Sequence, residues 1–278
     1  MSTLTSEYWE VDGVPLHTFA HSVENVSGNW TAPTRFRGEN RKVAYRAGAM
    51  HRPKPADQKI ESLAMWVSDR DADNQLSGGN TPHTQFNQNW LALRRLLWRD
   101  DGEQFVLTKR WESSPGVWIT ASALAEFHSG LEPRQIGRNA GRFAVDLLLA
   151  DPYYYGQQQM TLVPLNTPTV ITNDGDVILR KIGLTFNGEL GNPTLTNGTP
   201  EPEVWVKVGS QIAAGDAISL DVMDYTAVRA SDSANLIGAV THSGARQWMA
   251  LATGSNTLTL TADSGDGTCQ VDYTPAYH

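Results

Sequence analysis

Residues 142–159 read RFAVDLLLADPYYYGQQQ, and this stretch contains both a strand and the point where the chain changes character. Phe143, Val145, Leu147 and Leu149 alternate with Arg142, Ala144 and Asp146, which is the period of two of a strand with one buried face. Asp-Pro and three tyrosines close the apolar run, and three glutamines follow it. This change predicts a domain boundary near 156–160, with an ordinary loop inside one continuous domain as the alternative.

The charge distribution changes at the same place. Residues 1–156 hold 17 Lys and Arg against 18 Asp and Glu, whereas residues 157–278 hold 5 against 12. A chain of 278 residues is long enough for two ordinary domains. We therefore expect a first domain over 1–157 and a second over 158–278. The net charge of −8 argues against general nucleic-acid binding, which needs a basic surface.

The first domain is expected to be mostly strand with one helix. Asp12-Gly13 between two apolar-rich arms is a two-residue hairpin signal, because both turn positions need a positive φ. Alternating apolar residues predict further strands around 43–46, 63–67, 105–107, 117–123 and 142–149. A helix is predicted over about 84–98, with Thr84 as its N-cap, because apolar residues recur at helical spacing: Phe86, Trp90, Leu93 and Leu97.

The second domain shows short strands at about ten-residue spacing with turn residues between them, which is typical of an all-β sandwich. The expected strands are 160–165, 168–172, 177–186, 203–208, 217–223, 226–230, 235–240, 257–262 and 268–273. No helix is expected in this half.

The sequence offers little catalytic or metal-binding chemistry. There is no nucleophile elbow, phosphate-binding loop or His-Glu-x-x-His motif, and the single Cys269 excludes thiolate zinc sites. His17 and His21 lack a third ligand. Asp69-x-Asp71-x-Asp73 resembles the start of an EF-hand loop, but Asn stands where the sharp turn needs Gly and where the last ligand should be Glu. We expect a polar loop there, with a weak calcium site as the alternative, and no enzyme activity, cofactor or resident metal.

Carboxylates that lie close in sequence keep a glycosidase open as a rival hypothesis. Such pairs, for example Asp100 with Asp101 and Glu201 with Glu203, lie in turn-like sequence where solvated carboxylates are expected. The sequence contains no run of about 18 apolar residues, so no membrane span is expected, and its start has no secretory pattern.

One segment is strongly basic. Between residues 35 and 54 a single acidic residue, Glu39, stands against seven basic ones: Arg35, Arg37, Arg41, Lys42, Arg46, Arg52 and Lys54. Such a surface could contact an acidic partner or a neighbouring subunit. A strand edge kept charged to prevent aggregation is the alternative, and nucleic-acid binding is a weaker one.

The nine tryptophans raise the question of sugar binding, although Trp also anchors cores and interfaces. Trp205 alternates with Val204 and Val206, so its side chain points to the opposite face of its strand. If the valines face the core, Trp205 is the candidate contact for a ligand or partner in the second domain.

The order of these pieces resembles a known protein family. A short Asp-Gly hairpin comes first, then a basic segment with MHRPK (50–54), an apolar strand and a single helix. A long strand ends in LLADPYYYG (148–156), and the second domain carries NDGD (173–176) and WMALATGSNTL (248–258). This order is similar to that of the distal tail proteins (Dit), or minor tail proteins, of siphoviruses, the long-tailed phages with non-contractile tails.

The resemblance implies a mainly β fold: an N-terminal split-barrel belt domain with one helix and a C-terminal galectin-like β-sandwich. It also implies a homohexameric ring at the distal end of the virion tail, assembled in the cytoplasm of the bacterial host. One face of the ring joins the tail tube protein, and the other carries tail-tip or baseplate proteins and host adsorption. A module that binds host cell-wall carbohydrate is the alternative, and for it the galectin-like fold is only an analogy.

Overall fold

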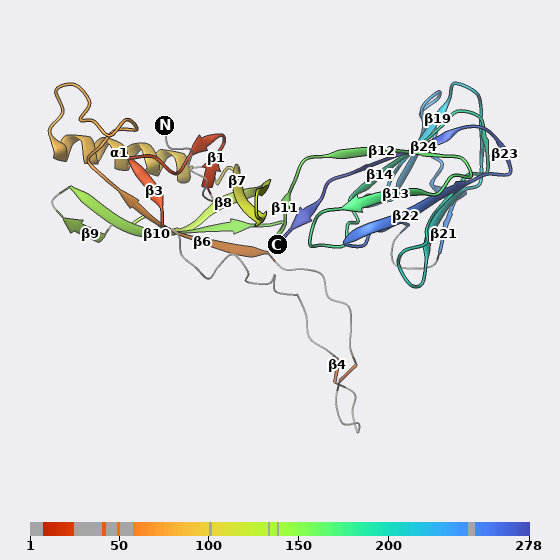
Figure 1. The fold of residues 1–278 in the computed structure, drawn as a ribbon, viewed down its shortest axis with the longest axis horizontal. Coiled ribbons are helices and arrows are strands. Elements are labelled where there is room, and N and C mark those ends of the chain that lie inside the picture. Colours follow the sequence, from red (N-terminus) through yellow and green to blue (C-terminus); the bar gives the residue numbers. More distant parts are fainter. Residues whose placement is uncertain are drawn as a thin grey trace. The chain divides into compact units, whose positions relative to one another are not determined.

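The computed structural model describes residues 8–24, 41–42, 49–50, 58–99, 102–132, 134–137, 139–243 and 248–278 (Figure 1). The chain divides into two compact units, Met1–Tyr154 with His278 (the N-terminal unit) and Tyr155–Tyr277 (the C-terminal unit). Strands dominate both units, and the described residues include a single α-helix. Within the described ranges, no helix has both the length and the apolar character needed to cross a membrane.

The N-terminal unit is built on a curled, half-barrel sheet. Its strands run in the order β2-β1-β7-β8-β10-β6-β3, each antiparallel to its neighbour, and β9 pairs with β10. The bounds are β1 Tyr8–Val11, β2 Val14–Pro15, β3 His21–Val23, β6 Lys59–Val67, β7 Phe105–Ser114, β8 Val117–Gly130, β9 Arg134–Gly137 and β10 Ala140–Leu149. A separate hairpin joins β4 (Arg41–Lys42) to β5 (Ala49–Met50), and β11 (Tyr154–Tyr155) lies at the border between the units.

The predicted Asp12-Gly13 hairpin is present. Val11 pairs with Val14, and the two turn residues have φ values of 48° and 78°. Both turn positions are therefore left-handed, as a two-residue hairpin loop requires, and glycine adopts such a φ without a steric penalty.

Helix α1 spans Pro82–Leu97, and its N-cap is Thr81 rather than the expected Thr84. The Thr81 hydroxyl accepts a hydrogen bond from the Thr84 backbone N–H at 3.2 Å. Proline fits the first helical position because it has no N–H to lose, so Thr81-Pro82 was the better start signal.

The helix covers one face of the N-terminal sheet (Figure 1), where the Trp90 ring meets Phe143 edge-on with centroids 5.1 Å apart. Leu93 and Leu97 are buried as expected, but the other buried residues are polar. Gln85 and Asn89 hydrogen-bond each other, and the Asn89 amide donates to the Ser68 carbonyl at 2.9 Å. The buried face of α1 is thus polar in its first half and apolar in its second half. The polar half forms hydrogen bonds with the loop that precedes the helix.

The C-terminal unit contains two five-stranded antiparallel sheets, which form the two layers of a sandwich (Figure 1). The first, in the order β12-β24-β14-β19-β20, comprises Gln159–Pro164, Thr268–Tyr273, Ile182–Asn187, Ala217–Asp221 and Thr226–Arg229. The second, in the order β13-β22-β16-β17-β21, comprises Thr169–Asn173, Gly254–Thr261, Thr194–Asn197, Val204–Val208 and Val240–His242. Smaller pairings join β15 (Leu190–Gly191), β18 (Gln211–Ile212) and β23 (Ser264–Gly265), and β25 is Ala276–Tyr277.

Alternate residues of both large sheets are buried, for example Leu184 and Phe186 on β14 and Val206 and Val208 on β17. Each sheet therefore turns one apolar face inward, and the inward side chains form the core of the sandwich. The predicted fold class, mainly β with a half-barrel, one helix and a β-sandwich, is confirmed.

Several strand boundaries differ from the prediction. Residues 235–240 are not a strand: Ile237–Ala239 form a 3-10 turn (η1), and the strand begins at Val240. The strand predicted over 177–186 begins at Ile182, and β16 over Thr194–Asn197 was missed. Short apolar runs carry too little periodicity to separate a strand from a turn. The strand predicted around 43–46 falls outside the described residues.

Candidate interaction surfaces

The described residues contain no group of three or more His, Cys, Asp or Glu side chains that could hold a metal ion. Cys269 lies on the inner face of β24, and burial raises the pKa of its thiol far above the ordinary range. A thiol held protonated in this way is a poor nucleophile and a poor metal ligand.

His17 and His21, the pair closest to a metal-binding spacing, lie on the segment between β2 and β3 and at the start of β3. His17 Nδ1 lies 3.1 Å from Ser22 Oγ, and His21 Nε2 lies 3.3 Å from the Pro15 carbonyl oxygen. Burial lowers the pKa of both rings. The two histidines are therefore neutral near pH 7, and their polar contacts are local to this turn.

The loop with the three spaced aspartates is organised from within. Asp71 Oδ1 accepts backbone hydrogen bonds from Asp73 at 3.0 Å and from Gln75 at 2.8 Å. The loop is also tied to α1, because Asn80 donates to Gln85 Oε1 at 2.8 Å. The Asp71 carboxylate therefore closes a turn within the loop, which agrees with the expected polar loop.

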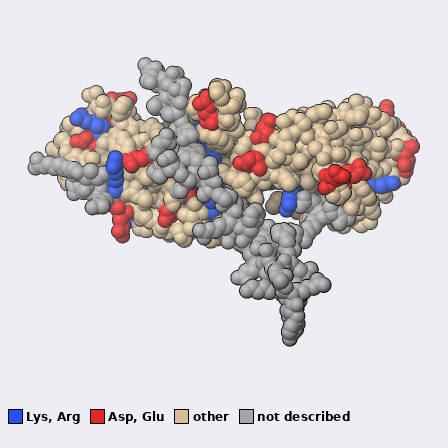
Figure 2. Space-filling model, turned by 60° about the horizontal axis from the view of Figure 1, so that its bottom comes forward, with Lys and Arg blue, Asp and Glu red and all other residues tan. Residues whose placement is uncertain are grey.

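Most of the basic segment lies outside the described residues. Arg41 and Lys42 fall on β4, and the other five basic residues, Arg35, Arg37, Arg46, Arg52 and Lys54, lie outside the described residues. Its role as an assembly contact stays a prediction. On the visible face of the described residues, charged side chains are scattered and form no large basic patch (Figure 2).

An exposed apolar row crosses the outer face of the N-terminal sheet. Val106 on β7 pairs directly with Leu124 on β8, and their side chains are 40% and 55% exposed. On the neighbouring strands Leu148 pairs with Ile60, which is 49% exposed. Glu126 is opposite Leu148, so Leu124, two residues earlier on β8, is its diagonal neighbour. Sequence periodicity does not reveal this row, because its members alternate with buried residues on four different strands and only the strand register brings them together.

Trp205 lies on the outer side of β17, because Val204 and Val206 are buried and the indole is half-buried. Its direct neighbour on β16 is Thr196. The structure therefore places Trp205 at the surface of the C-terminal unit, and its role as a ligand or partner contact stays a prediction.

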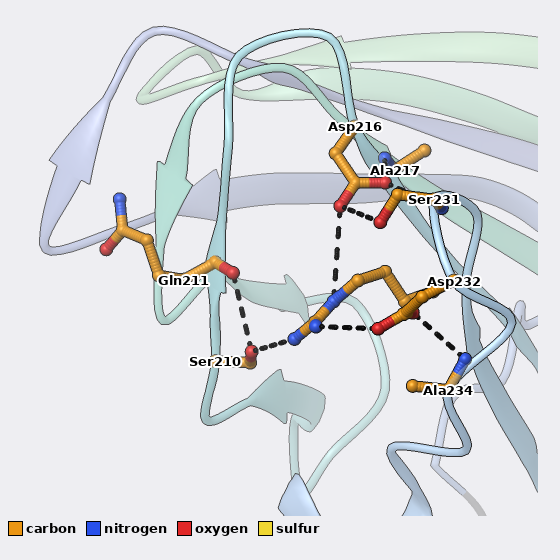
Figure 3. A network of polar contacts seen from close by, with 8 residues as sticks. Ser210, Gln211, Asp216, Ala217, Ser231, Asp232 and Ala234 are labelled. Carbon is orange, nitrogen blue, oxygen red and sulfur yellow. Dashed lines mark hydrogen bonds and ion pairs between the residues drawn. The ribbon is translucent and has the colours of Figure 1, made fainter.

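A polar cluster around Arg229 connects three loops of the C-terminal unit. Figure 3 shows the cluster, with Ser210, Asp216, Ser231 and Asp232 among its labelled residues. The guanidinium lies 3.4 Å from Asp232 Oδ2 and 4.0 Å from Asp216 Oδ2, and it donates to Ser210 Oγ at 3.3 Å. Asp216 in turn accepts the Ser231 hydroxyl at 2.8 Å and the Ala217 backbone N–H at 2.8 Å. These bonds hold the ends of β18, β19 and β20 in a fixed arrangement.

Asp216 makes this cluster sensitive to pH. The Ser231 hydroxyl, followed by the Ala217 N–H, lowers the pKa of its carboxyl below the ordinary value. Its stabilising effect is therefore present above the unfolded-state pKa of about 4 and is lost as the pH falls through the lower folded-state pKa. We expect Asp216→Asn to lower the unfolding temperature at pH 7 and to approach the wild type below about pH 4.

Thermal unfolding followed by circular dichroism across pH 2.5–8 measures this difference. The control is Asp224→Asn, since Asp224 is an exposed carboxylate of the neighbouring turn. A gap between Asp216→Asn and the wild type that stays constant over the whole pH range would contradict the role of the charge.

The residues that organise the C-terminal unit are three buried asparagines: Asn173, Asn197 and Asn256. All three reach the segment 248–254, in which residues 248–251 are buried. Asn256 donates to the carbonyls of Ala252 and Gly254 at 2.8 and 2.9 Å, and its Oδ1 accepts the Ala252 N–H at 2.8 Å. Asn197 donates to the Ala250 carbonyl at 2.8 Å and to Asn256 Oδ1 at 3.0 Å. Buried polar backbone needs such partners, so the asparagines act in place of a strand neighbour.

Comparison with known proteins identifies the architecture. No family model matches the chain, and no curated protein is similar to it. Among solved structures, the Dit protein of phage SPP1, described as a paradigm of the hub adsorption apparatus in phages that infect Gram-positive bacteria, aligns over 97% of this chain and 99% of its own. The TM-score is 0.62 at 14% sequence identity.

Two structures of the phage P2 baseplate in its activated conformation, with Ca and with Sr, align over 96% of this chain and 98% of theirs. Their TM-scores are 0.39 and 0.37, at 10% and 9% sequence identity. The N-terminal half-barrel with its single helix and the C-terminal β-sandwich thus give this chain the fold of the SPP1 Dit protein over nearly its full length.

Proposed function

We propose that this chain is a structural hub of a phage tail tip. In this function it forms a hexameric ring that joins the tail tube protein to the tail-tip or baseplate and adsorption proteins at the distal end of the virion. The observation that carries the proposal is the full-length match in fold to a hub protein, covering 97% of this chain and 99% of that one. Assembly of the virion places the protein first in the cytoplasm of the infected bacterium.

The exposed apolar row on the N-terminal sheet, Val106, Leu124, Leu148 and Ile60, fits a subunit contact. Apolar side chains that neighbour one another on an exposed sheet face mark a surface that is covered in an assembly. In a ring each subunit contacts the next through two different patches, so the row needs a complementary surface elsewhere on the chain. The basic segment over 35–54 is the competing candidate for the same contact.

Size-exclusion chromatography with light scattering tests the ring. We expect a species of about 183 kDa, six times the chain mass of 30.5 kDa. A contact made by the basic segment weakens as salt rises, because charges are screened over about 10 Å at 0.1 M salt. A contact made by the apolar row persists in high salt. A strict monomer at every concentration and salt level would count against a self-assembling hub.

Substitutions in the row distinguish the two contacts. We expect Leu124→Thr combined with Val106→Thr to shift the hexamer towards monomer, with at least a tenfold rise in the dissociation constant, because the variants keep strand propensity but lose apolar area. The matched control is Val117→Thr, an exposed valine at the far end of the same hairpin. Loss of assembly in the control as well would remove the row from the interface.

A further inference from the structure

The outer face of the sheet β13-β22-β16-β17-β21 surrounds one aromatic ring with hydroxyl groups. Trp205 pairs with Thr196 on β16, and Thr196 pairs in turn with Thr259 on β22. On the other side, Val206 pairs with His242, so Ser243 is opposite Trp205 and donates its backbone N–H to the Trp205 carbonyl at 3.1 Å. Residues opposite each other in a sheet project to the same side, so Thr196 borders the indole and Thr259 follows on the next strand, whereas the Ser243 Oγ on the other side is buried.

Most of the rest of this face has the same composition, and its apolar exception is Val170 on β13, which is 63% exposed. A second row pairs Thr261 with Thr194, Thr194 with Lys207 and Lys207 with Thr241. Further along β13 and β22 lie Thr172, Ser255 and Thr257. These residues alternate with the buried ones, so the hydroxyls form one continuous outer surface around Trp205.

Two hydroxyls of the central row are free to bind a ligand. Among the described residues, the half-buried side chains of Thr196 and Thr259 make no hydrogen bond.

Charge narrows the chemistry of that ligand. Residues 157–278 carry 12 acidic and 5 basic side chains, yet the five strands of this sheet contain a single charged residue, Lys207. The outer face of the opposite sheet, in contrast, carries Asp221 and Asp272. A face without acidic side chains on an acidic unit offers no ion pair to a cationic ligand, and Lys207, its one charged residue, can donate hydrogen bonds to the hydroxyls of a neutral ligand.

We propose that this face binds a neutral saccharide chain, with Trp205 as its stacking platform. A pyranose ring presents a C–H face and a rim of hydroxyls, which match a half-exposed indole bordered by Thr196 and, one strand further, Thr259. The aromatic ring supplies apolar contact, and the two threonine hydroxyls can each donate and accept. This activity is additional to the tail hub and does not depend on ring formation.

The test is isothermal titration calorimetry of the full chain with three neutral probes: maltohexaose, chitohexaose and a galactan oligosaccharide. We expect one of them to bind with a dissociation constant of roughly 1 mM or tighter. Trp205→Ala is expected to weaken that binding at least tenfold. Thr196→Val combined with Thr259→Val keeps strand shape and is expected to weaken it by about threefold to tenfold.

The matched control is Thr185→Val, an outward threonine on the opposite sheet. It is expected to bind like the wild type, and circular dichroism checks that every variant keeps the wild-type unfolding temperature. If Trp205→Ala fails to fold, the double threonine variant decides the question, because it leaves the indole in place. Two results would overturn the proposal: no binding of any probe by the wild type at 10 mM, or binding that folded variants of this face do not weaken. A protein ligand that needs Trp205 while all sugars fail would assign the face to a protein partner instead.

Discussion

Asn256→Asp is expected to destabilise the C-terminal unit strongly at neutral pH. The substitution keeps the acceptor oxygen for the Ala252 N–H but replaces the amide that donates to the carbonyls of Ala252 and Gly254. A carboxylate oxygen then faces two carbonyl oxygens in a fully buried position. Each carbonyl that loses its donor costs about 1–3 kcal/mol, and the buried charge adds to this cost.

The expected loss is about 3–6 kcal/mol, against a total stability of about 5–15 kcal/mol for a typical domain. Urea denaturation followed by circular dichroism measures it. The matched control is Asn235→Asp, because the exposed Asn235 uses only its oxygen, which accepts the Ile237 N–H at 3.0 Å. Its loss should stay within about 0.5 kcal/mol.

The pH dependence of Asn256→Asp gives a second check. Burial raises the pKa of a carboxyl group, and the protonated acid regains one donor for a carbonyl. The folded-state pKa is then above the unfolded value of about 4, so the variant loses stability as the pH rises past that value. A loss below 1 kcal/mol at pH 7 would show that the segment 248–254 does not depend on Asn256.

The asparagines show what the sequence could and could not tell. The NDGD and WMALATGSNTL segments stood out as parts of a family resemblance, and Asn173 and Asn256 lie within them. Hydrophobic periodicity does not predict that Asn173 and Asn256 are buried, because asparagine is typical of turns and of solvent-facing positions in a strand. Their role depends on contacts between strands far apart in sequence, such as the pairing of Ile171 with Asn256.

Sequence patterns predicted the structure correctly where neighbouring residues determine the local backbone conformation. The Asp12-Gly13 hairpin was predictable because two adjacent residues determine a two-residue turn. The helix was found from its spacing, but its first half buries Gln85 and Asn89 in place of an apolar face. A polar side chain is buried only where it finds hydrogen-bond partners. Asn89 finds them in carbonyl groups of the loop before the helix, and a periodic sequence pattern gives no information about such contacts.

Surfaces were the least predictable feature. The direction of Trp205 followed from its alternation with valines, but the hydroxyls beside it come from β16, β22 and the residue after β21. The apolar row on the N-terminal sheet likewise joins four strands through their register. Register is a property of the folded sheet, so a single sequence does not reveal which outward residues become neighbours.

Glu61→Leu is expected to destabilise the N-terminal unit by about 3–5 kcal/mol, the usual cost of breaking a buried ion pair. Lys59 and Glu61 lie on the inner face of β6, with side chains only 8% and 4% exposed, and Lys59 Nζ is 2.9 Å from Glu61 Oε2. The hydroxyl of the buried Tyr154 donates to the same carboxylate oxygen at 3.3 Å. Burial, followed by the Glu61 charge, raises the pKa of Tyr154, so this hydroxyl stays protonated and remains a donor.

Removing Glu61 leaves the Lys59 ammonium without its carboxylate. Lys109 is also buried, and its Nζ lies 4.0 Å from the centre of the Tyr154 ring, while Lys59 Nζ lies 5.4 Å from it. Without Glu61, the buried charge of Lys59 is left near a second lysine and the same aromatic ring. Lys109 keeps the His278 carbonyl as an acceptor at 3.0 Å, so the main cost falls on Lys59.

A double-mutant cycle separates the charge from the packing. We expect Lys59→Met combined with Glu61→Leu to recover stability to within about 1 kcal/mol of the wild type, because apolar residues of similar volume can replace a buried pair. Each single substitution should be strongly destabilising in urea denaturation. If Glu61→Leu alone costs less than 1 kcal/mol, water or another group satisfies Lys59, and the N-terminal unit does not depend on the ion pair for its stability. If the double variant is as unstable as the single ones, the hydrogen bond from Tyr154 carries the energy instead, and Tyr154→Phe should reproduce the loss.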